Sequence, residues 1–485
     1  MQTGSSQFRY QAVEDHVMGL IDSCVLTPGD KLPSLRKLSA RLDASISTIT
    51  QAYLELERKG VVESRPRSGF YVRAPRRLPT PSSGDGMQAA RAVSRTKLIN
   101  TVLESVGRPD LTPLGIICPS SQELLPGRAL ARIMASVLRE QPHRSLEYET
   151  IPGNLELRKQ ISLLGLDHGT RFAPEDMIVT SGALEALYIS LRATTRPGDT
   201  VLIMSPTYFC FLQLVETLGL RAIEVSSHPE HGIDPGDIKD ALDKYDITAS
   251  VLCPNFNNPD GSLTPESAKA EIVRLFAQRG VPLVEDDVYG DLHFGNARPR
   301  TFKSYDTSGM VILCSSFSKT LAPGYRVGWM VPGRYRDKAL EIKATTNVCS
   351  ASPTQMALGE FLRQGLYDKH LKRLRSAIHK QRDVMLHHVG EQFPEGTRAT
   401  RPEGGSVLWL ELPGGVNCVD YFYEARARGI GVAPGNIFST QDKFKSFIRL
   451  SLGGVWDHPK ELGIRELGRL ARAMAGQPAG TRSRE

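Results

Sequence analysis

The chain has 485 residues, of which 40% are hydrophobic and 23% charged, and its formal net charge is +7 at pH 7. This composition excludes a disordered or fibrous chain, and the length allows about three globular domains. No run of about 18 apolar residues occurs, which excludes a membrane span, and seven dispersed cysteines without a CxxC pair argue against a disulfide framework or a metal site and favour a reducing cytoplasm.

The basic excess lies mainly near the N-terminus. Residues 1–77 contain 12 Lys and Arg against 8 Asp and Glu, so this short stretch carries +4 of the net +7. A basic edge on a small domain indicates nucleic-acid binding, although an ordinary solvated surface could carry the same charge. After Glu57 the stretch has one acid, Glu63, against a cluster of arginines: Arg65, Arg67, Arg73, Arg76 and Arg77.

Apolar spacing predicts three helices and a hairpin in the same stretch. The first helix is expected over about residues 10–25. Ser34 and Ser45 are good N-caps for the second and third helices, and Gly60 ends the third. The segment VVESRPRSGFYV then predicts two short strands around a turn. This order is the layout of a winged helix-turn-helix, a mainly α domain that we place at residues 1–77.

Residues 33–72, from PSLRKLSARLDASISTITQAYLELERKG to VVESRPRSGFYV, resemble the GntR-type winged helix. The resemblance implies that the N-terminal turn of the third helix enters the major groove of a double-stranded DNA operator and that the wing binds phosphates. Ile46 departs from the pattern, because family members usually have an arginine there, so the family's operator preference is not transferred. The expected DNA contacts are Arg36, Ser45, Ser47, Thr48, Thr50, Arg67, Ser68 and Gly69.

A change of composition follows this domain. Residues 78–97 are rich in Pro, Gly and Ser and predict a flexible linker. From residue 98 to residue 480, short apolar runs such as 177–179, 201–204 and 311–313 alternate with longer helical stretches. This alternation predicts an α/β domain whose mostly parallel sheet is covered by helices on both faces. One helix is expected to begin after Thr264 as N-cap, with Pro265 as its first residue, and to end before Gly280.

The most specific motif of the chain is CSSFSKTLAPGYRVGW at 314–329. Lys319 follows an apolar strand and a serine-rich turn, and Arg326 comes seven residues later. A lysine that forms a Schiff base must lie near an aldehyde, and an arginine offers a phosphate two directed donors. With PNFNNPDG at 254–261 and VEDDVYG at 284–290, this motif resembles the type I pyridoxal 5′-phosphate (PLP) fold of the aspartate-aminotransferase superfamily, which has a smaller α+β lobe beside the large one.

The resemblance implies a role for each matching residue. Lys319 would form the Schiff base with PLP, and Asp286 would pair with the ring nitrogen and keep it protonated. Arg449 would bind the α-carboxylate of a substrate or effector. Tyr148 would reach the phosphate of the neighbouring subunit, which implies a head-to-tail homodimer. The other matches would bind the ring (Tyr208, Asn258, Tyr289) and the phosphate (Ser181, Gly182, Ala183, Ser316, Ser318, Arg326).

Three of these assignments have an alternative. Asp287 could pair with the ring nitrogen instead of Asp286, although the spacing to Tyr289 favours Asp286. Tyr208 could be a core residue. Arg449 could be an arginine of the surface or of an ion pair.

In its order of winged helix, linker and aminotransferase-like domain, the chain resembles the MocR subfamily of bacterial regulators. The resemblance implies a cytoplasmic, nucleoid-associated transcriptional regulator whose second domain senses PLP or a small amino compound through imine exchange at Lys319. Two alternatives stay open. The chain could be a working PLP-dependent aminotransferase with an accessory DNA-binding domain, or PLP could be a structural remnant.

Overall fold

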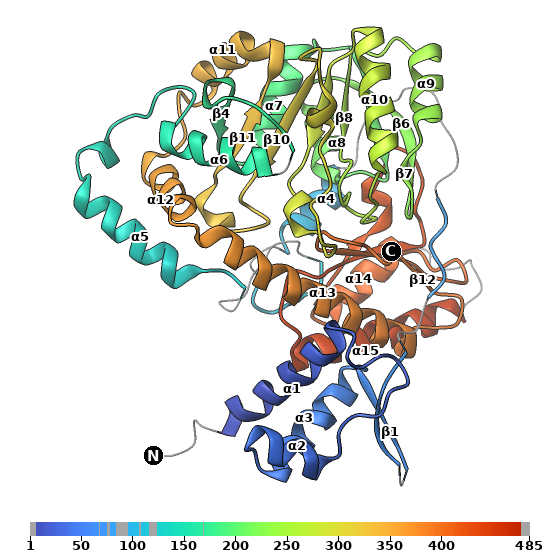
Figure 1. Cartoon of the computed structure of the whole chain (residues 1–485). Coiled ribbons are helices and arrows are strands. Elements are labelled where there is room, and N and C mark those ends of the chain that lie inside the picture. The colour runs from blue at the N-terminus through green and yellow to red at the C-terminus, as the bar shows by residue number, and fades with distance from the viewer. Residues whose placement is uncertain are drawn as a thin grey trace. The chain divides into compact units, whose positions relative to one another are not determined.

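The computed structural model describes residues 6–66, 68–74, 78–83, 96–105, 108–115, 124–167 and 169–476 (Figure 1). The chain divides into two compact units. Unit 1 comprises residues 1–78 and 382–393, and unit 2 comprises residues 79–381 and 394–485. The helix α13 (Leu366–Gln392) contributes residues to both units. No helix within the described ranges is both long and apolar enough to cross a lipid bilayer.

Unit 1 contains the predicted three helices and hairpin. Its core is apolar and includes Leu38, Ile49 and Val62, all fully buried. The first helix ends earlier than predicted, because Cys24 has φ 57°, a left-handed conformation that a helix cannot continue. The elements are α1 (Ser6–Asp22), α2 (Leu35–Leu42), α3 (Ile46–Arg58), β1 (Val62–Arg65) and β2 (Gly69–Val72), and the two strands pair antiparallel.

Two serines cap α2 and α3, as the sequence predicts. Ser34 Oγ accepts the Lys37 N–H at 3.3 Å, and Ser45 Oγ accepts the Thr48 N–H at 3.1 Å. Each hydroxyl thereby satisfies a backbone donor that has no partner inside its helix.

Replacing Ser45 with alanine is expected to destabilise the first turn of α3 by about 1 kcal/mol, because the Thr48 amide loses its acceptor. Hydrogen exchange of the full chain measures this as about fivefold faster exchange of the Thr48 amide. Ser47→Ala is the control, since the Ser47 hydroxyl contacts Ser45 Oγ at 2.8 Å but caps no amide that we observe in α3. Equal exchange in the two variants would contradict the capping role.

An eight-stranded sheet forms the centre of unit 2. Its five central strands, β10, β9, β8, β5 and β6, are parallel neighbours, while β11 and β7 run antiparallel to their neighbours. Each of the three predicted apolar runs coincides with a strand, although Met177 lies one residue before its strand. Three strands of the sheet were not predicted: β6 and β11, whose apolar character polar or glycine residues interrupt, and β7, which has only two residues. In spatial order the strands are β4 (Ile178–Thr180), β11 (Gly328–Val331), β10 (Val311–Ser316), β9 (Leu283–Asp286), β8 (Ala249–Leu252), β5 (Thr200–Ser205), β6 (Arg221–His228) and β7 (Gly232–Ile233).

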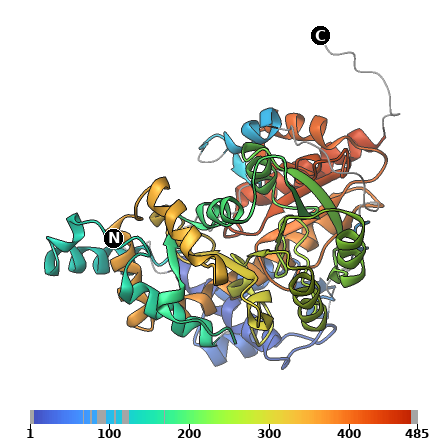
Figure 2. The ribbon, with the colours of Figure 1, turned by 90° about the horizontal axis from the view of Figure 1, so that it is seen from above.

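Helices cover both faces of this sheet (Figures 1 and 2). Along β5, Val201 and Ile203 join the core under α7 (Ala183–Thr194), α8 (Phe209–Thr217) and α11 (Arg336–Thr346). Leu202 and Met204 point to the other core, under α9 (Pro235–Lys244) and α10 (Glu266–Arg279). Because successive side chains of a strand alternate between faces, a strand buried on both faces is apolar at every position.

The rest of unit 2 forms a smaller lobe and a helical edge. The smaller lobe is an antiparallel sheet in the order β12 (Arg398–Ala399), β13 (Val407–Glu411), β16 (Phe447–Ser451) and β15 (Ala433–Pro434), with helices α14 (Cys418–Ala427) and α15 (His458–Ala475). A short parallel pair joins β3 (Thr112–Pro113) to β14 (Ile430–Gly431). The remaining helices are α4 (Thr96–Leu103), α5 (Gly127–Glu140), α6 (Leu155–Asp167) and α12 (Ser352–Arg363).

The start of α10 differs from the prediction by one residue. Pro265, not Thr264, is the N-cap, and its carbonyl accepts the Lys269 N–H at 2.9 Å. The Thr264 hydroxyl accepts the N–H of Ile233 instead. Gly280 ends the helix as predicted, with φ 68°. The prediction of the cap was wrong because a threonine can bind a distant backbone amide as well as its own helix.

Candidate functional site

The chemical motifs of unit 2 follow the carboxyl ends of its strands. Ser181 comes after β4, Tyr208 after β5, Asn258 after β8 and Lys319 after β10, while Asp286 is the last residue of β9. These five strands run in one direction, so their carboxyl ends meet at one edge of the sheet. Ligands of open α/β sheets bind at such an edge.

Asp286 carries a buried acceptor at this edge. The residue is 5% exposed, and burial, followed by the charge of Asp287, raises its pKa to about 7, while the charge of Lys319 acts in the opposite direction. Its Oδ1 atom is buried and has no hydrogen-bond partner among the described residues. A buried acceptor without a donor costs free energy, so this atom fits a ligand that brings a donor, as a protonated ring nitrogen does.

Asp287 has its own partners. Its Oδ2 atom binds the Arg298 guanidinium, and its Oδ1 atom accepts a hydrogen bond from Asn255 Nδ2 at 2.9 Å. Asp287 follows the end of β9, and both of its carboxylate oxygens have partners outside that strand. The geometry therefore favours Asp286 over Asp287 as the group available to a ligand.

An anion-binding arrangement lies at the N-terminus of α7. Arg326, itself at φ 54°, donates to Ser181 O and to Ser318 Oγ, each at 3.2 Å, and the Ser318 N–H donates to Ser316 Oγ at 3.3 Å. Gly182 is the N-cap with φ 94°, and a Cβ there would collide with Arg326. The structure thus brings together a guanidinium, hydroxyls and a helix N-terminus (at Ala183), which suits a phosphate.

Ser181 is held by hydrogen bonds to residues that were not predicted from the sequence. Its N–H donates to Glu185, the third residue of α7, and Asn347 Nδ2 donates to its hydroxyl at 3.3 Å. Lys343, fully buried, donates to Glu185 Oε1 at 2.9 Å. The Ser181 amide is therefore already occupied. A glutamate at the third position of a helix, where it can accept a hydrogen bond from an amide before the helix, was the available signal.

Arg449 lies in the interior, not on the surface. It is 2% exposed on β16, and it donates from Nη1 to Asn258 Oδ1 at 3.1 Å and from Nη2 to Gly115 O at 2.5 Å. Its guanidinium carbon lies 5.1 Å from the centre of the Phe438 ring. A guanidinium held this rigidly is suited to bind a carboxylate.

Tyr208 takes part in both the core and this site. Its ring packs on Phe211 with the centroids 5.6 Å apart, while burial raises its hydroxyl pKa and both Tyr289 and Arg449 act on that hydroxyl. Cys210, which was not among the predicted site residues, lies beside Tyr208. Burial raises the Cys210 pKa to about 11, against the lowering effects of Tyr208, Lys319 and Arg449. Nothing in the local sequence predicts that a cysteine two residues after Tyr208 lies beside the site.

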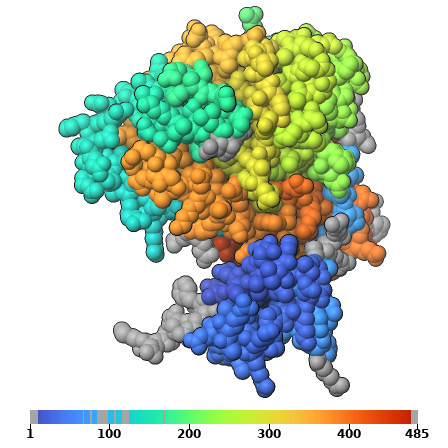
Figure 3. Space-filling model, viewed as in Figure 1, coloured from blue at the N-terminus to red at the C-terminus, as the bar shows by residue number. Residues whose placement is uncertain are grey.

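Tyr148 is not enclosed by its own chain. It follows a 3₁₀ turn at Arg144–Leu146, and both Leu146 and Tyr148 are 87% exposed. Figure 3 shows α5 and the segment after it, in teal, at the surface of unit 2.

In unit 1 the predicted DNA contacts gather around the start of α3 and the hairpin. Ser45 Oγ lies 2.7 Å from Thr48 Oγ1, and the Thr50 hydroxyl donates to Ile46 O at 2.8 Å, so these hydroxyls already serve the helix, and each can still accept a further bond. Arg67 lies outside the described residues. Exposed positions include Arg36, Ser45, Ser47 and Gly69, while Ser68 is half-buried.

In and beside the hairpin lie residues that were not among the expected DNA contacts. The Arg65 guanidinium carbon lies 4.2 Å from the centre of the Tyr71 ring, and Tyr71 shares a hydrogen bond of 2.6 Å with Ser68. Lys31 Nζ lies 5.9 Å from the same ring. Two cations on one aromatic ring give the hairpin a basic face suited to phosphates.

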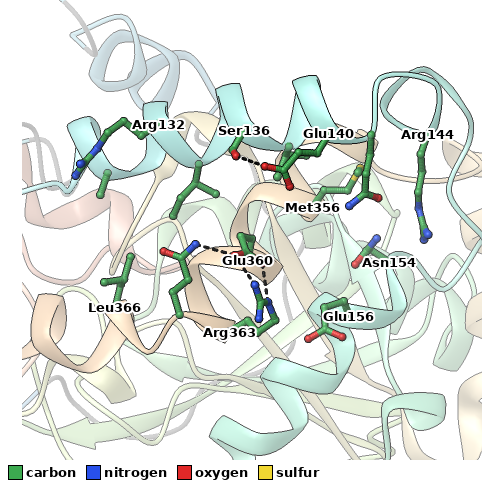
Figure 4. Close-up of a pocket in the computed structure, with 15 residues that line it drawn as sticks. Arg132, Ser136, Glu140, Arg144, Asn154, Glu156, Met356, Glu360, Arg363 and Leu366 are labelled. Carbon is green, nitrogen blue, oxygen red and sulfur yellow. Dashed lines mark hydrogen bonds and ion pairs between the residues drawn. The ribbon is translucent and has the colours of Figure 1, made fainter.

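A separate groove of about 860 Å³ lies between α5, α6 and α12 (Figure 4). Its charges are largely paired, since Arg363 Nε donates to Glu360 at 2.7 Å and Ser136 donates to Glu140 at 2.5 Å. The groove therefore has no excess of one sign, and none of the residues predicted to bind the cofactor lines it.

Comparison with known proteins agrees with this division. Residues 121–458 match the aminotransferase class I and II family, and residues 9–72 match the gntR family of bacterial regulatory proteins. The uncharacterized HTH-type transcriptional regulator YjiR of Escherichia coli is 35% identical over 91% of this chain and 94% of its own length. The 2-aminoadipate transaminase of Thermus thermophilus is 30% identical over 81% of this chain and 98% of its own length.

Two solved structures resemble the chain closely. The α-aminoadipate aminotransferase LysN of Thermus thermophilus, complexed with N-(5′-phosphopyridoxyl)-L-leucine, has a TM-score of 0.71 at 28% identity, covering 78% of this chain and 95% of its own. The kynurenine aminotransferase of Pyrococcus horikoshii, complexed with PMP, has a TM-score of 0.72 at 27% identity with the same coverage.

Proposed function

The chain belongs to the aminotransferase class I and II family and to the HTH-type regulators of the MocR subfamily, and on this premise we propose that it is a PLP-responsive transcriptional regulator. One observation carries the proposal. A buried acceptor at Asp286, an anion site at Arg326 and Lys319 meet at one sheet edge, in a chain whose other unit is a capped winged helix. We place its action at the nucleoid, in the cytoplasm.

PLP would be held by residues of this edge. Asp286 Oδ1 would accept a hydrogen bond from the protonated ring nitrogen, Arg326 and Ser318 would bind the phosphate, and Tyr208 would cover the ring. Tyr289 and Asn258 bind the ring oxygen. Bound PLP supplies an aldehyde that condenses with amines and a ring that withdraws electrons. Phosphate donors also come from Gly182, Ala183 and Ser316. Ser181 contributes its carbonyl contact to Arg326 rather than its amide, which Glu185 occupies.

Lys319 is the residue through which the domain responds. Lys319 would hold bound PLP through its aldehyde, and an amino compound would compete with Lys319 for that aldehyde, so that the freed lysine amine would carry a proton. The site therefore carries a different charge with and without the effector. A ligand shifts a conformational equilibrium only by its difference in affinity for the two states, and this change of charge provides such a difference. PLP itself is the alternative effector.

A mobility-shift assay on DNA flanking the chain's own coding region tests the regulator. Sequence-specific binding whose affinity changes when PLP or an amine is added is the expected result. Absence of sequence-specific binding, with and without PLP, would overturn the proposal. A scrambled DNA of equal length and charge measures the non-specific background, which does not depend on base sequence and weakens as the salt concentration rises.

Replacing Arg449 with glutamine is expected to weaken the response to amino acids about 10- to 100-fold, because a charge-assisted bond to a carboxylate contributes about 1.5–3 kcal/mol. Amines without a carboxylate should respond as they do in the wild-type chain, which controls for damage to the fold. The absorbance change of bound PLP during titration measures both. Arg428→Gln, at an exposed arginine paired with Glu424, is the matched control. Equal weakening for both kinds of amine would contradict the role of Arg449.

A head-to-tail homodimer completes the proposal. The 87% exposure of Tyr148 and Leu146 supports a partner surface at the segment after α5. In the dimer the Tyr148 hydroxyl reaches the phosphate of the other subunit. Sedimentation of the full chain should give a dimer. In Tyr148→Phe the affinity of that dimer for PLP, measured by titration, should fall.

A working aminotransferase is the second candidate, favoured by the complete set of Lys319, Asp286 and Arg449. Similarity of fold does not decide turnover. Steady-state transamination with common amino acids discriminates, because the regulator forms the PLP adduct but turns over slowly or not at all.

A further inference from the structure

A buried chain of polar contacts connects the two sequence neighbours of the proposed PLP residues. It begins at Asp287, which follows Asp286, and ends at Thr320, which follows Lys319. All of its members lie in unit 2, and apart from Asp287, the alternative partner of the ring nitrogen, none of them is among the residues predicted to touch the cofactor. Arg298 and Tyr367 are the central members.

Arg298 bridges two carboxylates. One terminal nitrogen binds Asp287, while Nε donates to Asp291 Oδ1 at 2.6 Å. The Arg298 side chain is 10% exposed, and the two carboxylates raise its pKa against the effect of burial. Gly290 leaves the space for this bridge, because a Cβ at that position would lie 2.5 Å from Arg298 Nη2.

Tyr367 continues the chain to the Lys319 segment. Its hydroxyl donates to Asp291 Oδ2 at 2.8 Å and lies 2.9 Å from the Thr320 hydroxyl. His370 Nε2 binds the Thr320 carbonyl at 2.6 Å, one turn further along α13. Both Tyr367 and His370 are buried, so these bonds are protected from water. The first turn of α13 therefore holds the peptide next to Lys319 from two sides.

We propose that Arg298 and Tyr367 are positioning residues of the PLP site. Arg298 neutralises Asp287 and so limits the negative charge beside Asp286. Tyr367 fixes the backbone next to Lys319 through its hydrogen bond to Thr320. Because the two share Asp291, a change at one end alters the other end of the chain of contacts. This inference rests on the proposed binding of PLP at Lys319.

Removing the Tyr367 hydroxyl is expected to weaken the neutralisation of Asp287 by Arg298. Asp291 then has one fewer donor and draws Arg298 towards itself, which leaves Asp287 less neutralised. The negative charge of Asp287 is then less compensated near the ring. Greater negative charge favours the protonated form of the adduct between Lys319 and PLP.

The experiment is a pH titration of the PLP-loaded full chain, followed by the absorbance of the adduct. In Tyr367→Phe the midpoint is expected to rise by about 0.5 pH unit or more, a shift of the size that one neighbouring charge causes. Tyr305→Phe is the matched control. It also removes a hydroxyl that donates to a carboxylate, Glu266 at 2.6 Å, but within the described part of the chain Tyr305 makes no hydrogen bond to Asp287, Asp291, Arg298 or Thr320.

A structural role alone predicts a different pattern. Both variants should lower the melting temperature of the PLP-free chain, Tyr367→Phe more than Tyr305→Phe, since the first loses two hydrogen bonds of a buried hydroxyl and the second loses one exposed bond. Of these two variants, only Tyr367→Phe should shift the midpoint of the pH titration of the PLP adduct. Arg298→Lys, which keeps one charge but cannot bridge two carboxylates as a guanidinium does, should move it in the same direction.

The outcomes separate the inference from the function it rests on. A midpoint in Tyr367→Phe that equals the wild-type value, or falls, overturns the positioning role. A wild-type chain that forms no adduct overturns both the positioning role and the proposed binding of PLP.

Discussion

Lys319→Ala is expected to abolish the covalent binding of PLP and every effector response that depends on it. The lysine amine alone can condense with the aldehyde at this place in the site, and the remaining contacts to Asp286 and Arg326 are non-covalent. The absorbance of the lysine adduct should disappear completely. Binding to operator DNA should persist within about twofold, because unit 1 and its core do not involve Lys319.

Its control is Lys338→Ala, which removes a half-exposed lysine of α11 that pairs with Glu341 at 2.7 Å. That variant should keep both the adduct and the DNA response to amines. A response in Lys319→Ala equal to that of the wild-type chain would contradict the sensor, and it would instead favour PLP as a structural remnant.

Asp286→Asn is expected to stabilise the PLP-free chain while weakening its binding of PLP. Burial, then Asp287, raises the pKa of Asp286 from 3.8 to about 7. Between these values the folded chain holds a proton that the unfolded chain has lost. The stability of the PLP-free chain therefore falls as the pH rises from about 4 to about 7, by up to about 4 kcal/mol from this group, and stays lower above that range.

Asparagine cannot ionise, so it removes this dependence. Denaturant unfolding of the PLP-free chain should show Asp286→Asn to be more stable than wild type by up to about 4 kcal/mol near pH 8 and little changed near pH 4. PLP should bind about 10- to 100-fold more weakly, because the bond to the ring nitrogen loses its charge.

The test is that Asp286→Asn raises the stability of the PLP-free chain while it lowers the affinity for PLP, since a residue with only a structural role would destabilise the chain when replaced. Asp337→Asn, at a 98% exposed side chain, should change neither property. Glu285 keeps its own pH dependence in all of these chains, so the difference between them isolates Asp286. A destabilised Asp286→Asn near pH 8 would contradict the reasoning.

Much of the fold was predictable because its signals are local. Ser34 and Ser45 cap their helices, and the apolar runs at 201–204 and 311–313 are strands, because capping and strand burial depend on residues a few positions apart. The prediction failed at Thr264, whose hydroxyl binds the amide of Ile233, 31 residues away. No local pattern reports such a contact.

The candidate site divides in the same way. Motif spacing selected Lys319, Asp286 and Arg326, and their roles stay predictions. It could not identify Lys343, which acts on Glu185 across 158 positions, because a buried ion pair leaves no trace in either local sequence. Tyr148 was selected too; it is exposed, and its contact with a partner subunit stays a prediction.

The length, the basic stretch at residues 1–77 and the motif order by themselves determined the class of the protein, since a winged helix and a lysine motif are each encoded within short segments. The tertiary structure alone decided which neighbouring group does what. Asp286 has an unfilled buried acceptor while Asp287 is neutralised by Arg298, and Tyr367 holds Thr320 beside Lys319. Those distinctions come from burial and from contacts between residues far apart in the chain, which exist only once the sheet and helices have assembled.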